Sequence, residues 1–154
     1  MLSCCVIGHR RVEISEQLKN NIKEIIYNLI NKGVSKFLFG SKSEFVDLCN
    51  EIVIDIQKEF PNVQRIYVRA EYPIISEEYY KYLKTLYDDS YYYDSKKISG
   101  KLSYIKRNEF LVRVSDYCLF YYKDSYQPNT KTKSGARLAY DYATKKRKAI
   151  INVC

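Results

Sequence analysis

Glycine, hydroxyl and charged residues occur together in four short runs, of which the first three directly follow apolar segments. The runs are Gly8-His9-Arg10-Arg11, Gly40-Ser41-Lys42-Ser43-Glu44, Arg69-Ala70-Glu71-Tyr72 and Ser134-Gly135-Ala136-Arg137. Backbone N–H groups at glycine-bearing turns and helix N-termini bind phosphate, and arginine adds two parallel hydrogen bonds to a phosphate or carboxylate. These residue types therefore indicate a site for an anionic partner.

The sequence also argues against several common sites. It contains no Gly-x-Gly-x-x-Gly and no Gly-Lys-Ser/Thr after a strand, so NAD or ATP bound in the usual manner is not expected, and we predict no cofactor. His9 is the only histidine and no Cys-x-x-Cys pair occurs, so we predict no metal site. The five cysteines include the adjacent Cys4 and Cys5, and this odd, scattered set favours buried thiols over disulfides.

Strand-like apolar runs and helix-like periodicities alternate along the chain and position these residues. Strands are predicted at 2–7, 37–39, 63–68, 117–122 and 149–153. Helices are predicted from a Ser15 cap to Lys32-Gly33, from a Ser43 cap to before Pro61, over 76–87, over 102–114 and from a Ser134 cap onward. The tyrosine-rich segment 88–100 is predicted to be a mobile loop, and 123–133 a polar loop.

This alternation predicts the fold class and the place of the site. Strands that alternate with helices favour an α/β, Rossmann-like three-layer sandwich with a mostly parallel central sheet, here as a single domain over 1–154. In such a sheet ligands bind outside the carboxyl ends of the strands. The runs after the strands are therefore expected to meet in one pocket.

The overall composition limits the partners. The formal net charge of +8 agrees with an anionic partner, and it does not distinguish a phosphorylated small molecule from a nucleic acid. The 17 tyrosines could stack on bases or lie at the edge of the core. No apolar run approaches the roughly 18 residues of a membrane span, and no signal peptide is recognisable, so we expect a cytoplasmic protein without a membrane partner.

An ordered series of motifs resembles the SLOG superfamily, specifically its small bacterial and phage branch related to the DUF1273 proteins. The motifs are Ile7-Gly8-His9-Arg10, Phe39-Gly40-Ser41-Lys42-Ser43-Glu44-Phe45, Tyr104-Ile105-Lys106-Arg107-Asn108, Ser115-Asp116-Tyr117, Lys133-Ser134-Gly135-Ala136-Arg137 with the residues to Ala143, and Lys148-Ala149-Ile150-Ile151-Asn152-Val153. They span nearly the whole chain in the order found in that superfamily.

The resemblance implies a Rossmann-like fold, a site for nucleotides or nucleotide-derived molecules at the strand ends, and a homo-oligomer. By position it places Gly8, His9 and Arg10 against the ligand, with Gly40, Ser41 and Glu44 beside them. It also implies that Arg107 and Asn108 project from a helix into the pocket, and that Ser134, Gly135 and Arg137 receive phosphate. Arg69, at the end of the third strand, completes the expected ligand-binding set.

Three functions follow, in this order of preference. The first is binding of a nucleotide or an ADP-ribose-like molecule, as a sensor or sequestering protein linked to phage–bacterium defence signalling. The second is hydrolysis or transfer at an N-glycosidic bond, for which Glu44, Glu71 and His9 are the catalytic candidates. The enzymatic branch of the superfamily has threonine and a catalytic glutamate where this chain has Ala136 and no acid before Asp141, which disfavours an enzyme. The third is binding of single-stranded nucleic acid.

Overall fold

The computed structural model describes residues 1–94, 96–124 and 134–154. In this part of the chain the strands are β1 (Leu2–Gly8), β2 (Val34–Phe39), β3 (Gln64–Arg69), β4 (Asp89–Tyr92), β5 (Tyr117–Tyr121) and β6 (Ala149–Asn152). The helices are α1 (Glu16–Asn31), α2 (Glu44–Ile56), α3 (Glu77–Leu86), α4 (Lys101–Val114) and α5 (Gly135–Lys145).

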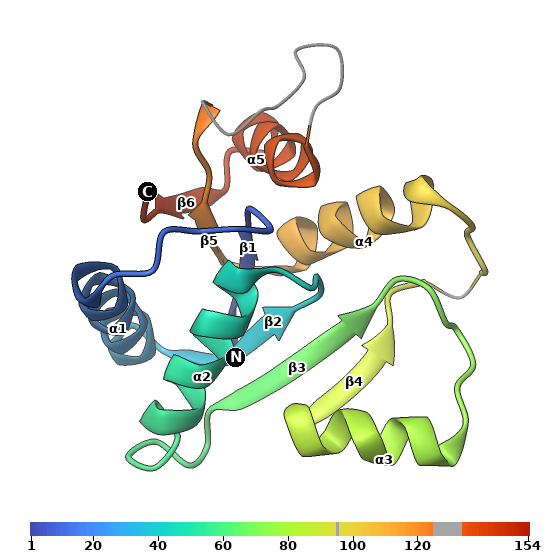
Figure 1. Cartoon of the computed structure of the whole chain (residues 1–154), viewed down its shortest axis with the longest axis horizontal. Helices are drawn as coiled ribbons and strands as arrows, with labels where there is room; N and C mark the ends of the chain where they lie inside the picture. The colour runs from blue at the N-terminus through green and yellow to red at the C-terminus, as the bar shows by residue number, and fades with distance from the viewer. Residues whose placement is uncertain (95, 125–133) are drawn as a thin grey trace.

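The strands form one sheet in the order β4-β3-β2-β1-β5-β6, and every neighbouring pair is parallel (Figure 1). The chain runs outward from β1 to β4 and then returns through α4 to β5, on the other side of β1. The strand order therefore reverses between β1 and β5, which is the point where open α/β sheets bind ligands. The predicted α/β, Rossmann-like architecture is confirmed.

Helices cover both faces of the sheet, and the central strands are apolar on both sides for this reason. Along β1, Cys4 and Val6 belong to the core under α1 and α2, whereas Cys5 and Ile7 belong to the core under α4 and α5. This alternation follows from the two-residue period of a strand. Four of the five cysteines, at 4, 5, 49 and 118, are buried thiols as predicted, whereas Cys154 is exposed near the end of the last strand. Burial raises the pKa of Cys4.

Serine caps fix where four of the helices begin. The Oγ atoms of Ser15, Ser43, Ser76 and Ser134 accept hydrogen bonds from the backbone N–H groups three residues later, at 3.0–3.1 Å. The helix starts predicted at Ser15, Ser43 and Ser134 are therefore confirmed. Each cap leaves the N-terminus of its helix at the edge where the parallel strands end.

One element was predicted wrongly. The segment 88–100 contains the strand β4, whose residues 89–92 pair with residues 66–69 of β3. Asp88 anchors it, because its carboxylate accepts hydrogen bonds from the backbone N–H and the guanidinium of Arg65. In this edge strand Ser90 is buried and Tyr91 is more exposed, an alternation that the flanking charged residues conceal in the sequence. The predicted loop 123–133 lies outside the described residues from 125 onward.

Two kinds of feature are absent from the described residues. None of their helices combines the length and the apolar composition needed to cross a membrane. Histidine, cysteine, aspartate and glutamate side chains nowhere gather in a group of three that could hold a metal ion, again within residues 1–94, 96–124 and 134–154.

Candidate functional site

Two adjoining hollows open at the carboxyl edge of the sheet. The first, which we call the glycine compartment, has a volume of about 540 Å³ and lies among Ile7–Arg10, Gly40–Ser43, Asn108 and Ser134–Ala136. The second, the tyrosine compartment, has a volume of about 450 Å³ and lies among Arg69–Tyr72, Ile74–Ser76 and Tyr79. Both are also lined by Lys42, Tyr67, Glu71, Tyr104 and Arg107, which form the junction between them.

The glycine compartment brings together most of the residues expected to bind the ligand. Gly8, His9, Arg10, Gly40, Ser41, Arg107, Asn108, Ser134 and Gly135 all line it. They come from the ends of β1 and β2, from α4 and from the start of α5. Arg69 lines the tyrosine compartment instead. Glu44 and Arg137 line neither compartment.

Arg107 is the most deeply buried charged side chain of the site, with 2% of its surface exposed. Its Nε donates to Asn108 Oδ1 at 2.9 Å, its Nη1 donates to the carbonyl of Val68 at 3.3 Å, and its guanidinium lies 5.8 Å from the centre of the Tyr104 ring. Among the described residues no carboxylate lies within ion-pair distance of it. Desolvation lowers the pKa of Arg107 to about 10. The charge therefore still predominates at neutral pH, and Glu71, the carboxylate that shares the junction with it, lies beyond ion-pair distance.

Gly40 makes room for this arginine. A Cβ atom on Gly40 would lie 2.7 Å from Cδ and 2.8 Å from Nε of Arg107, closer than side chains tolerate. A Cβ on Gly8 would overlap the ring of Phe45 in the same way. Both strand-end glycines are thus required by close packing around the compartment, and Gly40 in particular lets the guanidinium cross the end of β2.

The N-terminus of α5 closes the other side of the glycine compartment. Ser134 caps the helix through the N–H of Arg137, and Gly135 and Ala136 line the compartment. Backbone N–H groups in the first turn of a helix lack partners within the helix and carry a partial positive charge. Together with Arg107 they form an anion-binding environment. Arg137 itself lies 3.8 Å from Asp141 in an ion pair along the helix.

His9 connects the two strands at which the sheet order reverses. Its Nε2 accepts a hydrogen bond of 2.8 Å from the backbone N–H of Lys123, directly after β5, and its ring is 7% exposed. The acceptor nitrogen carries no proton. Desolvation lowers the pKa of His9. In this arrangement His9 holds the junction of β1 and β5 together.

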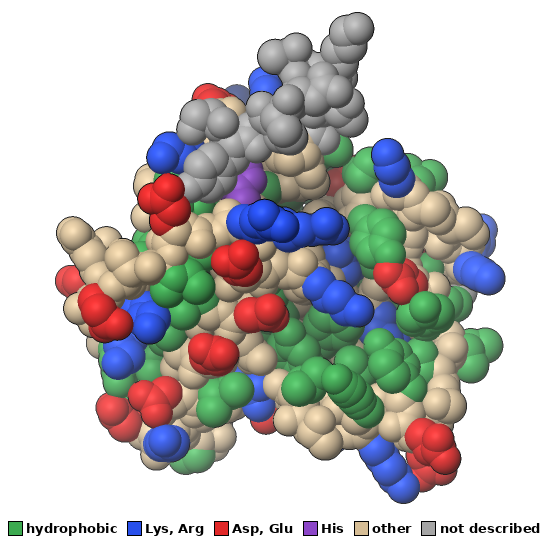
Figure 2. Space-filling view, viewed as in Figure 1, with side chains coloured by type: hydrophobic (Ala, Val, Ile, Leu, Met, Phe, Trp, Pro, Cys, Tyr) green, Lys and Arg blue, Asp and Glu red, His purple; other side chains and the backbone are tan. Residues whose placement is uncertain are grey.

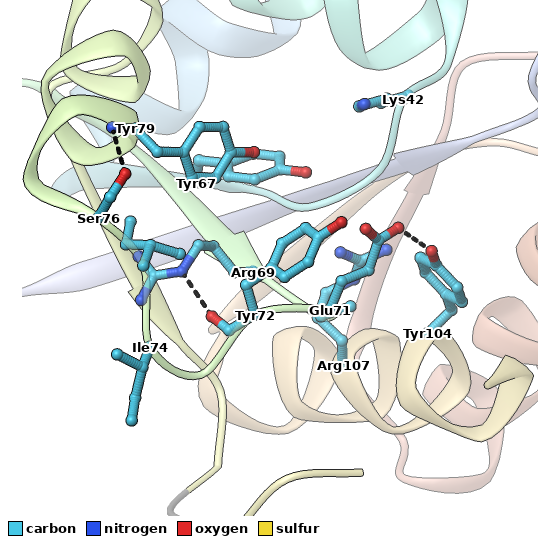
Figure 3. Close-up of a pocket in the computed structure, with 12 residues that line it drawn as sticks. Lys42, Tyr67, Arg69, Glu71, Tyr72, Ile74, Ser76, Tyr79, Tyr104 and Arg107 are labelled. Carbon is cyan, nitrogen blue, oxygen red and sulfur yellow. Dashed lines mark hydrogen bonds between the residues drawn. The ribbon is translucent and has the colours of Figure 1, made fainter. Parts of the chain in front are cut away.

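The two candidate carboxylates lie in different places. Glu71 lines both compartments, and its carboxylate accepts a hydrogen bond from the hydroxyl of Tyr104 (Figure 3). Glu44 is exposed on the first turn of α2, and its backbone N–H donates to the carbonyl of Arg10 at 2.8 Å. Only Glu71 is positioned to touch a ligand that occupies the cleft.

Sequence reasoning found part of the tyrosine compartment, in the run from Arg69 to Tyr72, and missed its other tyrosines. Tyr67 lies two residues before the end of β3, and Tyr79 and Tyr104 lie on helices, so none of them directly follows a strand. Figure 2 shows that a group of apolar side chains lies beside lysine and arginine side chains on this face of the molecule. One signal in the sequence could have indicated this compartment: the two-residue period of β3 places Tyr67 and Arg69 on the same side of the sheet.

No protein-family model matches the chain, and no curated protein is significantly similar to it.

Proposed function

We propose that this protein binds a nucleotide or a nucleotide-derived small molecule at the carboxyl edge of the sheet, with a phosphate in the glycine compartment. The observation that carries the proposal is Arg107, a buried guanidinium without a carboxylate partner in the described residues. A buried charge is costly unless it is paired and hydrogen-bonded. A bound anion would supply the missing partner.

The surroundings of Arg107 favour phosphate as that anion. The first turn of α5 and the turns after β1 and β2 offer backbone N–H groups, and the exposed side chains of Lys42 and Arg10 add positive charge at the rim. Each compartment lies within the usual range of about 300–1,000 Å³ for small-molecule sites. A nucleotide matches both the charge and the size.

The proposal includes the biological setting that the motif resemblance implies. We take the chain to be a SLOG-type domain that acts in the cytoplasm as a homo-oligomer, and that senses or sequesters a nucleotide signal in phage–bacterium defence. Support comes from the order of the motifs along the sequence, and from the position of Gly8, Gly40 and Ser134 in one compartment.

Thermal shift with a panel of nucleotides, NAD, ADP-ribose and cyclic ADP-ribose isomers tests the binding function. A ligand at about one hundred times its Kd stabilises a protein by about 2.7 kcal/mol, which raises the Tm of a domain of this size by about 5–10 °C. Arg107→Met should abolish the shift. Arg113→Met, on the exposed side of the same helix, is the matched control and should retain it.

Arg107→Met also separates a binding role from a structural one. Replacing a buried, unpaired charge with an apolar side chain of similar length is expected to leave the Tm of the ligand-free protein unchanged or higher. If the variant is strongly destabilised without ligand and the wild type responds to no anion, Arg107 serves packing and the proposal fails.

An enzyme remains the second candidate, because Glu71 lies at the junction of the compartments. Hydrolysis of an N-glycosidic bond needs a carboxylate near the anomeric carbon and a group that protonates the leaving base. Chromatography of the panel after incubation distinguishes the two functions. Ligand recovered unchanged supports binding alone, whereas release of a free base that is lost in Glu71→Gln supports the enzyme.

A further inference from the structure

We propose that the tyrosine compartment binds the nucleobase of the nucleotide whose phosphate occupies the glycine compartment, with the sugar at Glu71. This inference rests on the proposed function and adds the orientation of the bound nucleotide. The ligand lies across the junction, with its phosphate toward α5 and its base toward α3.

Aromatic rings surround the tyrosine compartment. Tyr67, Tyr72, Tyr79 and Tyr104 line it, and Figure 3 shows the first three on one side of Glu71 and Tyr104 on the other. Ring contacts hold three of them in place: Tyr67 stacks on Tyr87 at 5.1 Å between ring centres, and Tyr72 meets Tyr79 edge to face at 6.2 Å. Nucleobases stack on such aromatic side chains whatever the identity of the base.

Arg69 supplies a polar group at the inner wall of this compartment. The side chain is 8% exposed, its Nε donates to the carbonyl of Tyr72 at 3.0 Å, and its Nη1 donates to Ser90 Oγ at 3.1 Å. Nη2 makes no hydrogen bond with any residue that the structure describes. It is therefore available to donate to a ring nitrogen or carbonyl oxygen, which every nucleobase carries.

The composition of the compartment favours a base over a second phosphate. Its wall includes Ile74, Ile75 and the tyrosine rings. Helix α3 begins at this compartment with its cap Ser76, but Glu77 and Glu78 in its first turn repel an anion. The Glu71 carboxylate stands between the two compartments and disfavours a phosphate there. The same carboxylate can accept hydrogen bonds from sugar hydroxyls, as it does from Tyr104.

Isothermal titration of the whole protein with AMP, GMP, CMP, UMP, ribose 5-phosphate and inorganic phosphate tests this orientation. At least one nucleoside monophosphate should bind about tenfold or more tightly than ribose 5-phosphate, as expected for one stacked base. Tyr72→Ala should remove about tenfold of that affinity and leave ribose 5-phosphate unaffected.

Tyr82→Ala is the matched control for Tyr72→Ala. The two side chains are 51% and 52% exposed, and both rings contact Tyr79, but Tyr82 does not line the compartment. Its replacement should change neither affinity. Circular dichroism of both variants checks that the fold is retained.

The possible failures are distinguishable. If ribose 5-phosphate binds as tightly as every nucleotide, or if Tyr72→Ala weakens ribose 5-phosphate and nucleotides equally, the base does not occupy the tyrosine compartment although the proposed function stands. If neither the nucleotides nor ribose 5-phosphate nor inorganic phosphate binds, the proposed function and this inference both fail.

Discussion

Arg69 and Arg107 are both largely buried, and the fold holds them with neutral oxygen acceptors. Their hydrogen bonds go to backbone carbonyls, to a serine hydroxyl and to an asparagine amide oxygen. These acceptors orient each guanidinium without neutralising it. An arginine held in this way loses little side-chain entropy when an anion or a base arrives, which favours binding.

His9 makes stability depend on pH in a defined direction. Because burial lowers its pKa below 6.5, the native protein binds fewer protons at this residue than the unfolded chain does. The free energy of unfolding therefore includes a contribution that is fully present above about pH 6.5 and is lost as the pH falls through the lower native value. Urea unfolding between pH 8 and about pH 5 should show this loss of stability.

His9→Gln is the variant that assigns the effect. It retains a hydrogen-bond acceptor for the N–H of Lys123 but has no proton to gain, and His9 is the only histidine in the chain. The variant should therefore show a much flatter stability profile in this pH range. An unchanged profile would mean that other groups produce the pH dependence.

The elements of the fold bring two kinds of anion-binding group to one edge. Parallel strands end at the edge where α2 and α5 begin, so glycine turns and helix N-termini lie together there. Helices α1 and α5 both begin with a serine cap of the same geometry. Removal of each cap in turn therefore shows how much the N-terminus of α5 contributes to ligand binding.

Ser134→Ala and Ser15→Ala form this comparison. Both serines accept one backbone hydrogen bond at 3.1 Å, so each replacement should cost about 1 kcal/mol of stability, measured by urea unfolding. Only Ser134 lines the glycine compartment. Ser134→Ala should also weaken nucleotide binding, whereas Ser15→Ala should leave it unchanged. Equal affinities in the two variants would remove the start of α5 from the site.

The elements were more predictable from sequence than the site was. Apolar periodicity and serine caps identify β1 and the starts of α1, α2 and α5, because these features depend on neighbouring residues. Strand β4 was not predicted because the hydrogen bond that anchors it joins Asp88 to Arg65, 23 positions away in the sequence, and a local pattern does not reveal such a contact. The burial of Arg107 likewise depends on Gly40, far along the chain, and helical pattern alone would leave this arginine in solvent.

The whole molecule combines a cleft at the carboxyl edge of the sheet with a net charge of +8, and these two features predict different responses to salt. A nucleotide held by Arg107 and Lys42 makes few ion pairs, and buried pairs are screened less than exposed ones. A nucleic acid spread over the basic surface would make many. With 6–10 phosphate contacts, affinity falls by about 10³–10⁵ between about 50 and about 200 mM salt.

We therefore expect nucleotide affinity to fall less than about tenfold over this range of salt, because only one or two ion pairs are involved. Replacing Lys145 and Lys146 with glutamine reduces the charge of the exposed cluster at the end of α5 and should not alter nucleotide binding. A single-stranded oligonucleotide serves as the competing ligand in the same titrations. If it binds more tightly than every nucleotide, with a steep salt dependence that the double variant weakens, the basic surface is the functional site and the cleft is not.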